Sequence, residues 1–161
     1  MINEKVEKID VGQSIVLNKI PAQKFKTNYF EINFVRPLTL KEASQNALLM
    51  DVLLRGSKKN HDLKSINARL NENFGATLNS NVRKMGEDQI FGFSSGFIKD
   101  QLALEGKKVL KDMLNFIFEV LFDPKIENGR FLKSYVESEK KNLKDRINSK
   151  INDKRSYALI R

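Results

Sequence analysis

The sequence predicts an α+β domain in which a mainly antiparallel sheet is covered on one face by helices. Three observations lead there. The predicted strands come in neighbouring pairs joined by short turns, the helical periods are grouped between and after them, and hydrophobic residues make up 40% of the 161 residues. This length and composition suit one domain with a real core, so we predict a single domain over residues 1–161.

Two strands are predicted near the N-terminus, over residues 14–19 and 25–36. In the second strand, apolar and polar side chains alternate with the period of two that a half-buried strand requires. The apolar members of this pattern are Phe30, Ile32 and Phe34. Pro37 is expected to end the strand.

Two helices should follow in succession. The first is predicted over residues 40–55, because "TLKE" from Thr39 to Glu42 has the pattern of a capping box. The second should begin after Asp62, which can act as N-cap, and end at Gly75, which can adopt the left-handed conformation of a helix C-terminus.

A second pair of strands is predicted over residues 76–84 and 87–97, with "MGED" at 85–88 as the hairpin turn. Phenylalanines lie on one face of the second of these strands, and small residues lie on the other. The pairing of neighbouring strands through a tight turn is what makes the predicted sheet antiparallel.

The last third of the sequence is helical in pattern. A helix is predicted over 103–122, ended by Asp123-Pro124, and a long helix from near Arg130. Their apolar stripes are Val109, Met113, Phe116, Ile117, Val120 and Leu121 in the first, and Leu132, Val136, Leu143 and Ile147 in the second. A further helix should open over 152–161, so we expect the 161 residues to be truncated at the C-terminal end of the domain.

Composition narrows the possible chemistry. The sequence has no cysteine and one histidine, His61, which leaves no disulfide, no thiolate metal site and no multi-histidine site within the chain. His61 lies in a basic loop, and we interpret it as a solvated side chain. The N-terminus lacks an apolar signal region, and no run of about 18 apolar residues offers a membrane span, so a cytoplasmic protein is expected.

The net charge of +9 raises the possibility of a nucleic-acid partner. The basic residues near the C-terminus, however, are interleaved with acids around a predicted helix, and no stacking motif accompanies them. A solvated helix face is therefore favoured, and a nucleic-acid partner is not.

Two stretches carry a family resemblance. The first is "LLRGS" at 53–57, where a helix ends, and the second is "ENFGATLNSN" at 72–81, where the next helix gives way to a strand. This combination resembles the N-terminal domain of the insulinase-like (M16) zinc peptidases, which carry an inverted zinc motif, H-x-x-E-H, on the first of these helices. Gly56-Ser57 matches the Gly-Thr that follows the motif in that family.

The resemblance implies where the zinc motif should lie. Counting back from Gly56 puts its first histidine ligand at Ala47, its catalytic glutamate at Met50 and its second histidine at Asp51. The third ligand, a glutamate on a later helix, corresponds to Arg146, although Glu139 or Asp145 could shift into that place. A tetrahedral zinc site needs three protein ligands, so we predict no metal, no cofactor and no catalytic residue.

The stretches "DPKIENGRF", "ESEKKNL" and "NDKRSYA" look most like a bacterial, non-catalytic subgroup associated with aminopentanol modification of elongation factor P. The resemblance implies a peptide-binding or protein-binding chain that pairs with a homologous catalytic zinc peptidase subunit or with a second homologous domain. The alternatives are an active zinc metalloendopeptidase domain and a basic, translation-associated nucleic-acid binder.

Two local interpretations stay open. Asp51 is expected to be a buried or edge carboxylate paired with a base such as Arg55 one helical turn later, in preference to a residual metal contact. The strand residues Leu78, Asn79, Ser80 and Asn81 correspond to the family's peptide-binding strand, where a peptide adds as a further strand. The same residues equally suit a polar edge strand that resists aggregation.

Overall fold

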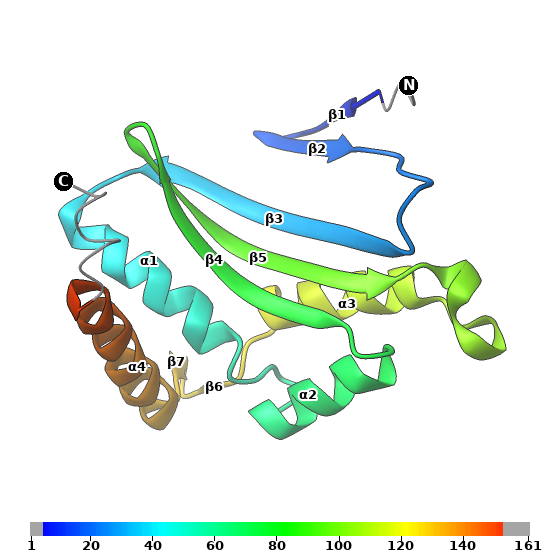
Figure 1. Cartoon of the computed structure of the whole chain (residues 1–161). Helices are drawn as coiled ribbons and strands as arrows, with labels where there is room; N and C mark the ends of the chain where they lie inside the picture. Colours follow the sequence, from blue (N-terminus) through cyan, green and yellow to red (C-terminus); the bar gives the residue numbers. More distant parts are fainter. Residues whose placement is uncertain (1–4, 153–161) are drawn as a thin grey trace.

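The computed structural model describes residues 5–152 and has the predicted α+β architecture (Figure 1). The sheet carries helices on one face, since α1 and α3 both contact its central strand β5, and α4 packs beside α1. The elements are β1 (Glu7–Gly12), β2 (Ile15–Lys19), β3 (Thr27–Pro37), α1 (Leu40–Leu53), α2 (Leu63–Glu72), β4 (Thr77–Met85), β5 (Asp88–Ile98), α3 (Val109–Phe122), β6 (Ile126–Glu127), β7 (Arg130–Phe131) and α4 (Lys133–Asn152), with short 3-10 turns at Asp100–Leu102 and Leu104–Gly106.

The main sheet has three antiparallel strands in the order β3-β5-β4. Phe93 in β5 lies between Ile32 in β3 and Ser80 in β4, which sets the register of both ladders. The predicted face pattern of β5 is confirmed: its phenylalanines Phe91, Phe93 and Phe97 are buried in the core, whereas Gly92, Ser94 and Gly96 occupy the opposite face.

The core lies between this sheet and α3. The predicted apolar stripe of α3 is confirmed, since Val109, Met113, Ile117 and Val120 are all 0% exposed. Met50 and Leu53 of α1 and Ile66 of α2 complete the same cluster. Burial of this continuous apolar surface is the main favourable contribution to folding.

The predicted N-caps Thr39 and Asp62 are confirmed, but the capping box predicted at Thr39 is only half formed, since the Glu42 carboxylate pairs with Arg36 at 3.5 Å. Thr39 accepts a hydrogen bond from the Glu42 backbone N–H at 3.2 Å, and Asp62 accepts one from the Ser65 backbone N–H at 2.7 Å. The backbone and side-chain hydrogen bonds from Ser65 hold the pKa of Asp62 below its usual value. The first helix ends at Leu53, two residues earlier than predicted, and the second ends at Glu72, shortly before the predicted Gly75.

Two later helices begin further along the chain than predicted. α3 starts at Val109 because Glu105 and Gly106 have φ angles of 57° and 68°, in the left-handed region that a right-handed helix cannot include. α4 starts at Lys133 because residues 126–131 form the small β6–β7 hairpin, turned by Asn128 and Gly129 in the same left-handed region. The helix predicted over 152–161 lies outside the described residues apart from Asn152.

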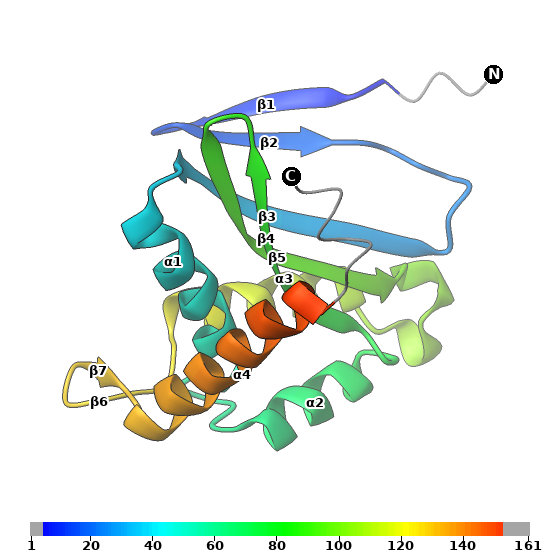
Figure 2. The same ribbon diagram turned by 60° about the vertical axis from the view of Figure 1, so that its left-hand side comes forward.

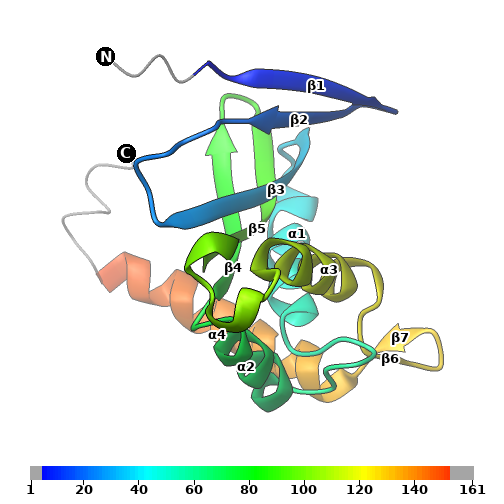
Figure 3. The ribbon, with the colours of Figure 1, turned by 90° about the vertical axis from the view of Figure 1, so that its right-hand side faces the viewer.

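The N-terminal strands form a sheet of their own. The strand predicted over 14–19 is confirmed as β2, but its antiparallel partner β1 was not predicted from the sequence. Figures 2 and 3 show this hairpin beyond β3, on the side away from the helices. Every residue of the hairpin is exposed.

No helix among residues 5–152 is both long and apolar enough to cross a membrane.

Candidate functional site

The positions that the resemblance assigns to the zinc motif lie on α1, where the helix meets the core. Ala47 and Met50 are 8% and 1% exposed, and both pack among apolar groups. Neither side chain offers the nitrogen or carboxylate oxygen that a zinc ligand or a general base needs. Among these three positions, only Asp51 carries a polar side chain.

Asp51 joins three elements through its carboxylate. One oxygen accepts a hydrogen bond from the Ser80 hydroxyl of β4 at 2.6 Å, and the other accepts one from Nη2 of Arg146 of α4 at 2.8 Å. The Asp51 side chain is only 10% exposed, whereas that of Arg146 is 52% exposed. The residue that the resemblance assigns to the third ligand thus contacts the residue that it assigns to the second.

Asp51 is a nearly buried carboxylate paired with a base, as expected, but that base is Arg146 and not Arg55. Arg55 instead donates a hydrogen bond to Glu139 of α4 at 3.1 Å, and its guanidinium lies 5.3 Å from the ring centre of Tyr135. Both α1 side chains face α4, and α4 presents an opposite charge to each of them. A partner across the helix interface therefore replaces the neighbour one turn away.

The two ion pairs fix how α1 and α4 pack against each other. Asp51 precedes Arg55 along α1, and their partners Arg146 and Glu139 come in the reverse order along α4. The two helices therefore run antiparallel where these pairs form. Figures 1 and 2 show the two helices side by side. Glu139 is 9% exposed and is held by Arg55.

These residues do not fit a zinc ion. A tetrahedral site needs three ligands, and the set here is an alanine, an aspartate already bonded to two donors, and an arginine. The guanidinium would repel a dication at the same place. Across the described part of the chain, no three His, Cys, Asp or Glu residues are grouped so that they could hold a metal ion.

The strand β4 lies at an edge of the sheet, with β5 as its only partner strand within residues 5–152. Met85 and Asp88 close a two-residue hairpin turn, so this pair exchanges main-chain hydrogen bonds, as does every second pair from there. Consistent with this alternation, the Gly96 N–H points toward Thr77. The main-chain groups of Leu78, Ser80 and Val82 therefore face the free edge.

The four residues of the expected peptide-binding stretch divide into two pairs. Leu78 and Ser80 present their main chains to the free edge, while their side chains point to the helix face, where Leu78 is buried and Ser80 contacts Asp51. Asn79 and Asn81 use their main chains in the ladder with β5 and carry their amides on the opposite face. The Asn81 amide accepts a hydrogen bond from Ser94 at 3.3 Å.

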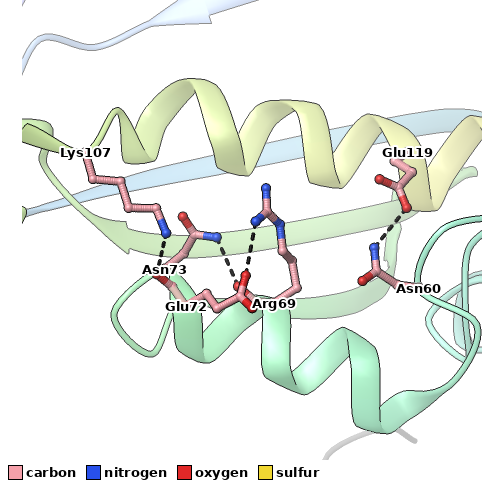
Figure 4. Close-up of polar contacts among 6 residues, drawn as sticks. All are labelled: Asn60, Arg69, Glu72, Asn73, Lys107 and Glu119. Atoms are coloured by element: carbon pink, nitrogen blue, oxygen red, sulfur yellow. Dashed lines mark hydrogen bonds and ion pairs between the residues drawn. The ribbon is translucent and has the colours of Figure 1, made fainter.

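A groove that sequence reasoning missed lies between α2 and α3, with a volume of about 880 Å³. Figure 4 shows its polar side chains: Arg69 pairs with Glu72 at 3.1 Å, and Asn60 donates to Glu119 at 2.9 Å. Glu119 also accepts a hydrogen bond from Ser57. The hydrogen bonds of Ser57 and Asn60 to Glu119 tie the loop after α1 to α3, and the Arg69–Glu72 pair lies within α2. Because these polar groups are bonded within the protein, we assign the groove a structural role. No sequence motif marks it, because its walls come from segments about fifty residues apart.

Gly56 has a steric reason to be glycine. A Cβ atom there would lie 2.7 Å from the carbonyl oxygen of His61. The tight loop that results places Ser57 against Glu119, while His61 is exposed, as predicted, and contributes only its carbonyl, which accepts a hydrogen bond from the Tyr135 hydroxyl. The Gly-Ser pair matched to the family's Gly-Thr thus shapes the end of α1.

The comparisons with known proteins bear on this site. No protein-family model matches the sequence. The sequence is 31% identical over 147 residues to a Bacillus subtilis (strain 168) protein named "Probable inactive metalloprotease YmfF", a match that covers 88% of this chain and 33% of that protein. The chain is a homologue of that metalloprotease-like protein. It spans about a third of the length of this relative.

The fold is also found in a solved structure. The crystal structure of a conserved protein from Enterococcus faecalis V583 superposes with a TM-score of 0.88 at 27% identity, over 95% of this chain and 36% of that one. The α+β fold of this metalloprotease homologue is therefore that of an experimentally determined structure.

Proposed function

We propose that the chain is a non-catalytic insulinase-like domain that binds an extended peptide or protein segment beside a homologous zinc peptidase, which performs the hydrolysis. The observation that carries the proposal is the ion pair between Asp51 and Arg146. The resemblance assigns these two positions to zinc ligands, and here they neutralise each other. Homology to a protein named as an inactive metalloprotease supports the non-catalytic part of the proposal.

The free edge of β4 supports the peptide-binding part. An extended peptide can add to such an edge through main-chain hydrogen bonds, which give affinity without a catalytic group. Ser80 ties the middle of β4 to α1 through Asp51, so the edge is held in a fixed geometry. A rigid edge loses less conformational entropy when a peptide binds.

Zinc content and hydrolysis test the absence of catalysis. We expect the purified protein to hold no stoichiometric zinc by mass spectrometry and to leave a library of fluorogenic peptides uncleaved. Stoichiometric zinc together with cleavage would overturn the proposal and favour the metalloendopeptidase alternative.

The paired arrangement has its own test. A homologous protein with an intact H-x-x-E-H motif, produced from the same genome, should co-purify with this protein and should cleave peptides faster in its presence. If elongation factor P modification depends on the pair, the mass of elongation factor P should change when this gene is deleted. An unchanged cleavage rate and an unchanged mass would contradict the partner and the pathway, respectively.

A proline at the free edge tests the binding strand. Val82→Pro removes a main-chain N–H that faces the edge and places a ring there, while the ladder with β5 stays intact. We expect Val82→Pro to lower peptide affinity at least about tenfold, as judged by fluorescence anisotropy. Val82→Thr, which keeps the N–H, is the matched control and should bind like the parent. Equal affinity in both variants would place peptide binding elsewhere.

A further inference from the structure

The exposed guanidinium of Arg146 lies beside the free edge of β4. Its Nη2 atom and the Ser80 hydroxyl bind the two oxygens of the same carboxylate, at 2.8 and 2.6 Å. This chain of contacts places the guanidinium within roughly 8 Å of the Ser80 hydroxyl. Only one of its nitrogens bonds to Asp51, and the side chain is 52% exposed, so donors of the guanidinium face solvent there.

The geometry of strand addition fixes which ligand residue would meet this group. A strand added at the free edge lies about 4.8 Å from β4, and the residue directly opposite Ser80 points to the same face as Ser80. For Ser80 that face is the helix face, where Asp51 and Arg146 lie. A side chain of one ligand residue is thus directed at the guanidinium.

The surrounding charge favours an acidic group at that position. β4 carries no acid, and Lys84 shares the face of Ser80, whereas Arg83 lies on the opposite face and pairs with Glu31. The α4 sequence contains six basic residues against three acids, and of those acids Glu139 is bonded to Arg55. Arginine binds carboxylates through two parallel hydrogen bonds, which gives direction as well as affinity.

We propose that Arg146 makes this site selective for an extended peptide with a carboxylate side chain, Asp or Glu, at the residue that pairs with Ser80. The proposal rests on the proposed function of the β4 edge and names its ligand class. Asp51 acts as the positioning residue, since it holds the guanidinium beside the strand. A cation at the place of the third ligand thereby changes the role of the site from polarising a peptide bond to recognising an acidic residue.

The probes are acetylated and amidated seven-residue peptides of alternating Thr and Val with Glu, Gln or Lys at the centre. A fourth peptide has the central Gln and a free C-terminal carboxylate, and it separates an acidic side chain from a chain terminus as the source of the carboxylate. We expect the Glu peptide to bind about tenfold more tightly than the amidated Gln peptide, and the Lys peptide to bind most weakly. A gain only for the free carboxylate would overturn the proposed side-chain selectivity.

Variants locate the effect. Arg146→Gln should bring the Glu and Gln peptides to equal affinity, and Arg146→Lys should keep part of the preference. Lys141→Gln, which removes the same charge from an exposed residue of the same helix, should leave the preference intact. Because Arg146→Gln leaves Asp51 with Ser80 alone, the double variant Asp51→Asn/Arg146→Gln supplies a neutral pair and should show the same loss of preference.

The outcomes separate this inference from the proposed function. If all peptides bind equally and Val82→Pro abolishes their binding, the edge binds peptides but Arg146 does not select them, and the inference is overturned. If the preference for the Glu peptide persists in Arg146→Gln, another cation supplies it, and the inference is overturned as well. If no peptide binds the parent protein, both the inference and the peptide-binding function fail.

Discussion

The Asp51 carboxylate is nearly buried, so hydrogen bonds from Ser80 of β4 and Arg146 of α4 replace most of its contacts with water. A carboxylate in this environment depends on its partners, because the loss of one leaves part of the charge without compensation. Arg146 is half exposed, so solvent screens its side of the pair and reduces the energy that the pair contributes.

A double-mutant cycle measures that energy. Asp51→Ala, Arg146→Ala and the double variant should give a coupling free energy of roughly 1 kcal/mol in urea unfolding, because the pair is short but partly screened. The control is the pair Glu137–Lys140, 3.9 Å apart and more than half exposed on both sides, whose cycle should give a coupling close to zero. Equal coupling in the two cycles would show that the contact between α1 and α4 carries no special energy.

At the residue scale, the sequence shows which side chain stands at a position, but it does not show which distant side chain contacts it. The resemblance assigns Ala47, Met50 and Asp51 to the zinc-motif positions by counting back from Gly56, and this assignment stays a prediction. The partner of Asp51 was predicted wrongly because the spacing rule for helices favours Arg55, four residues away. Arg146 is 95 residues away in sequence, and only tertiary packing brings it into contact.

Among the elements, β5 is the strand on which the packing of the sheet depends. It pairs on both sides, and the backbone of β3 approaches it so closely that a Cβ atom at Gly92 would lie 1.9 Å from the carbonyl oxygen of Ile32. Backbone lies on both sides of this contact, so no rotamer change can relieve it. The position therefore requires a residue without a side chain.

Replacement of this glycine should be costly. We expect Gly92→Ala to lower the free energy of unfolding by roughly 3 kcal/mol or more, because β3 would have to move away from β5. Gly96→Ala is the control on the same face of the same strand, where the added Cβ atom would meet only the Thr77 hydroxyl at 3.3 Å. Its effect in thermal or urea unfolding should be clearly smaller, and similar losses in the two variants would contradict the steric account.

Element type was predicted well, and element boundaries less well. Periodicity and caps identify β3, α1, α2, β4 and β5 because their signals are local. The start of α3 was predicted too early because Glu105 adopts a left-handed conformation. Glutamate usually favours helices, so the residue type gave no sign of this conformation. β1 was missed because "EKIDVG" shows little alternation, and its pairing with β2 decides its structure.

The whole molecule divides into a well-packed body and a thin N-terminal hairpin. The body combines the sheet with α1, α3 and their neighbours around one core, whereas β1 and β2 form a separate sheet with no buried residue. An isolated two-stranded hairpin is marginally stable in water. Local opening should therefore be far easier in the hairpin than in the body.

Hydrogen exchange tests this division. Peptides from β5 should exchange most slowly, at rates that approach those of global unfolding, and peptides from β1 and β2 should exchange within the first time points. Mass spectrometry of the native protein gives both rates in one experiment. Slow exchange in the hairpin would show that its exposed strands are covered in solution.

The Asp51–Arg146 pair also limits the single substitutions by which a metal site could be built at this place. Ala47 is only 8% exposed, so a larger histidine side chain at this position would have to displace its neighbours. A histidine in place of Asp51 would leave both Ser80 and Arg146 without their carboxylate acceptor. A glutamate in place of Arg146 would set two carboxylates against each other. Each single replacement should lower stability before any ligand set is complete, so a zinc site could be built here only if several positions changed together.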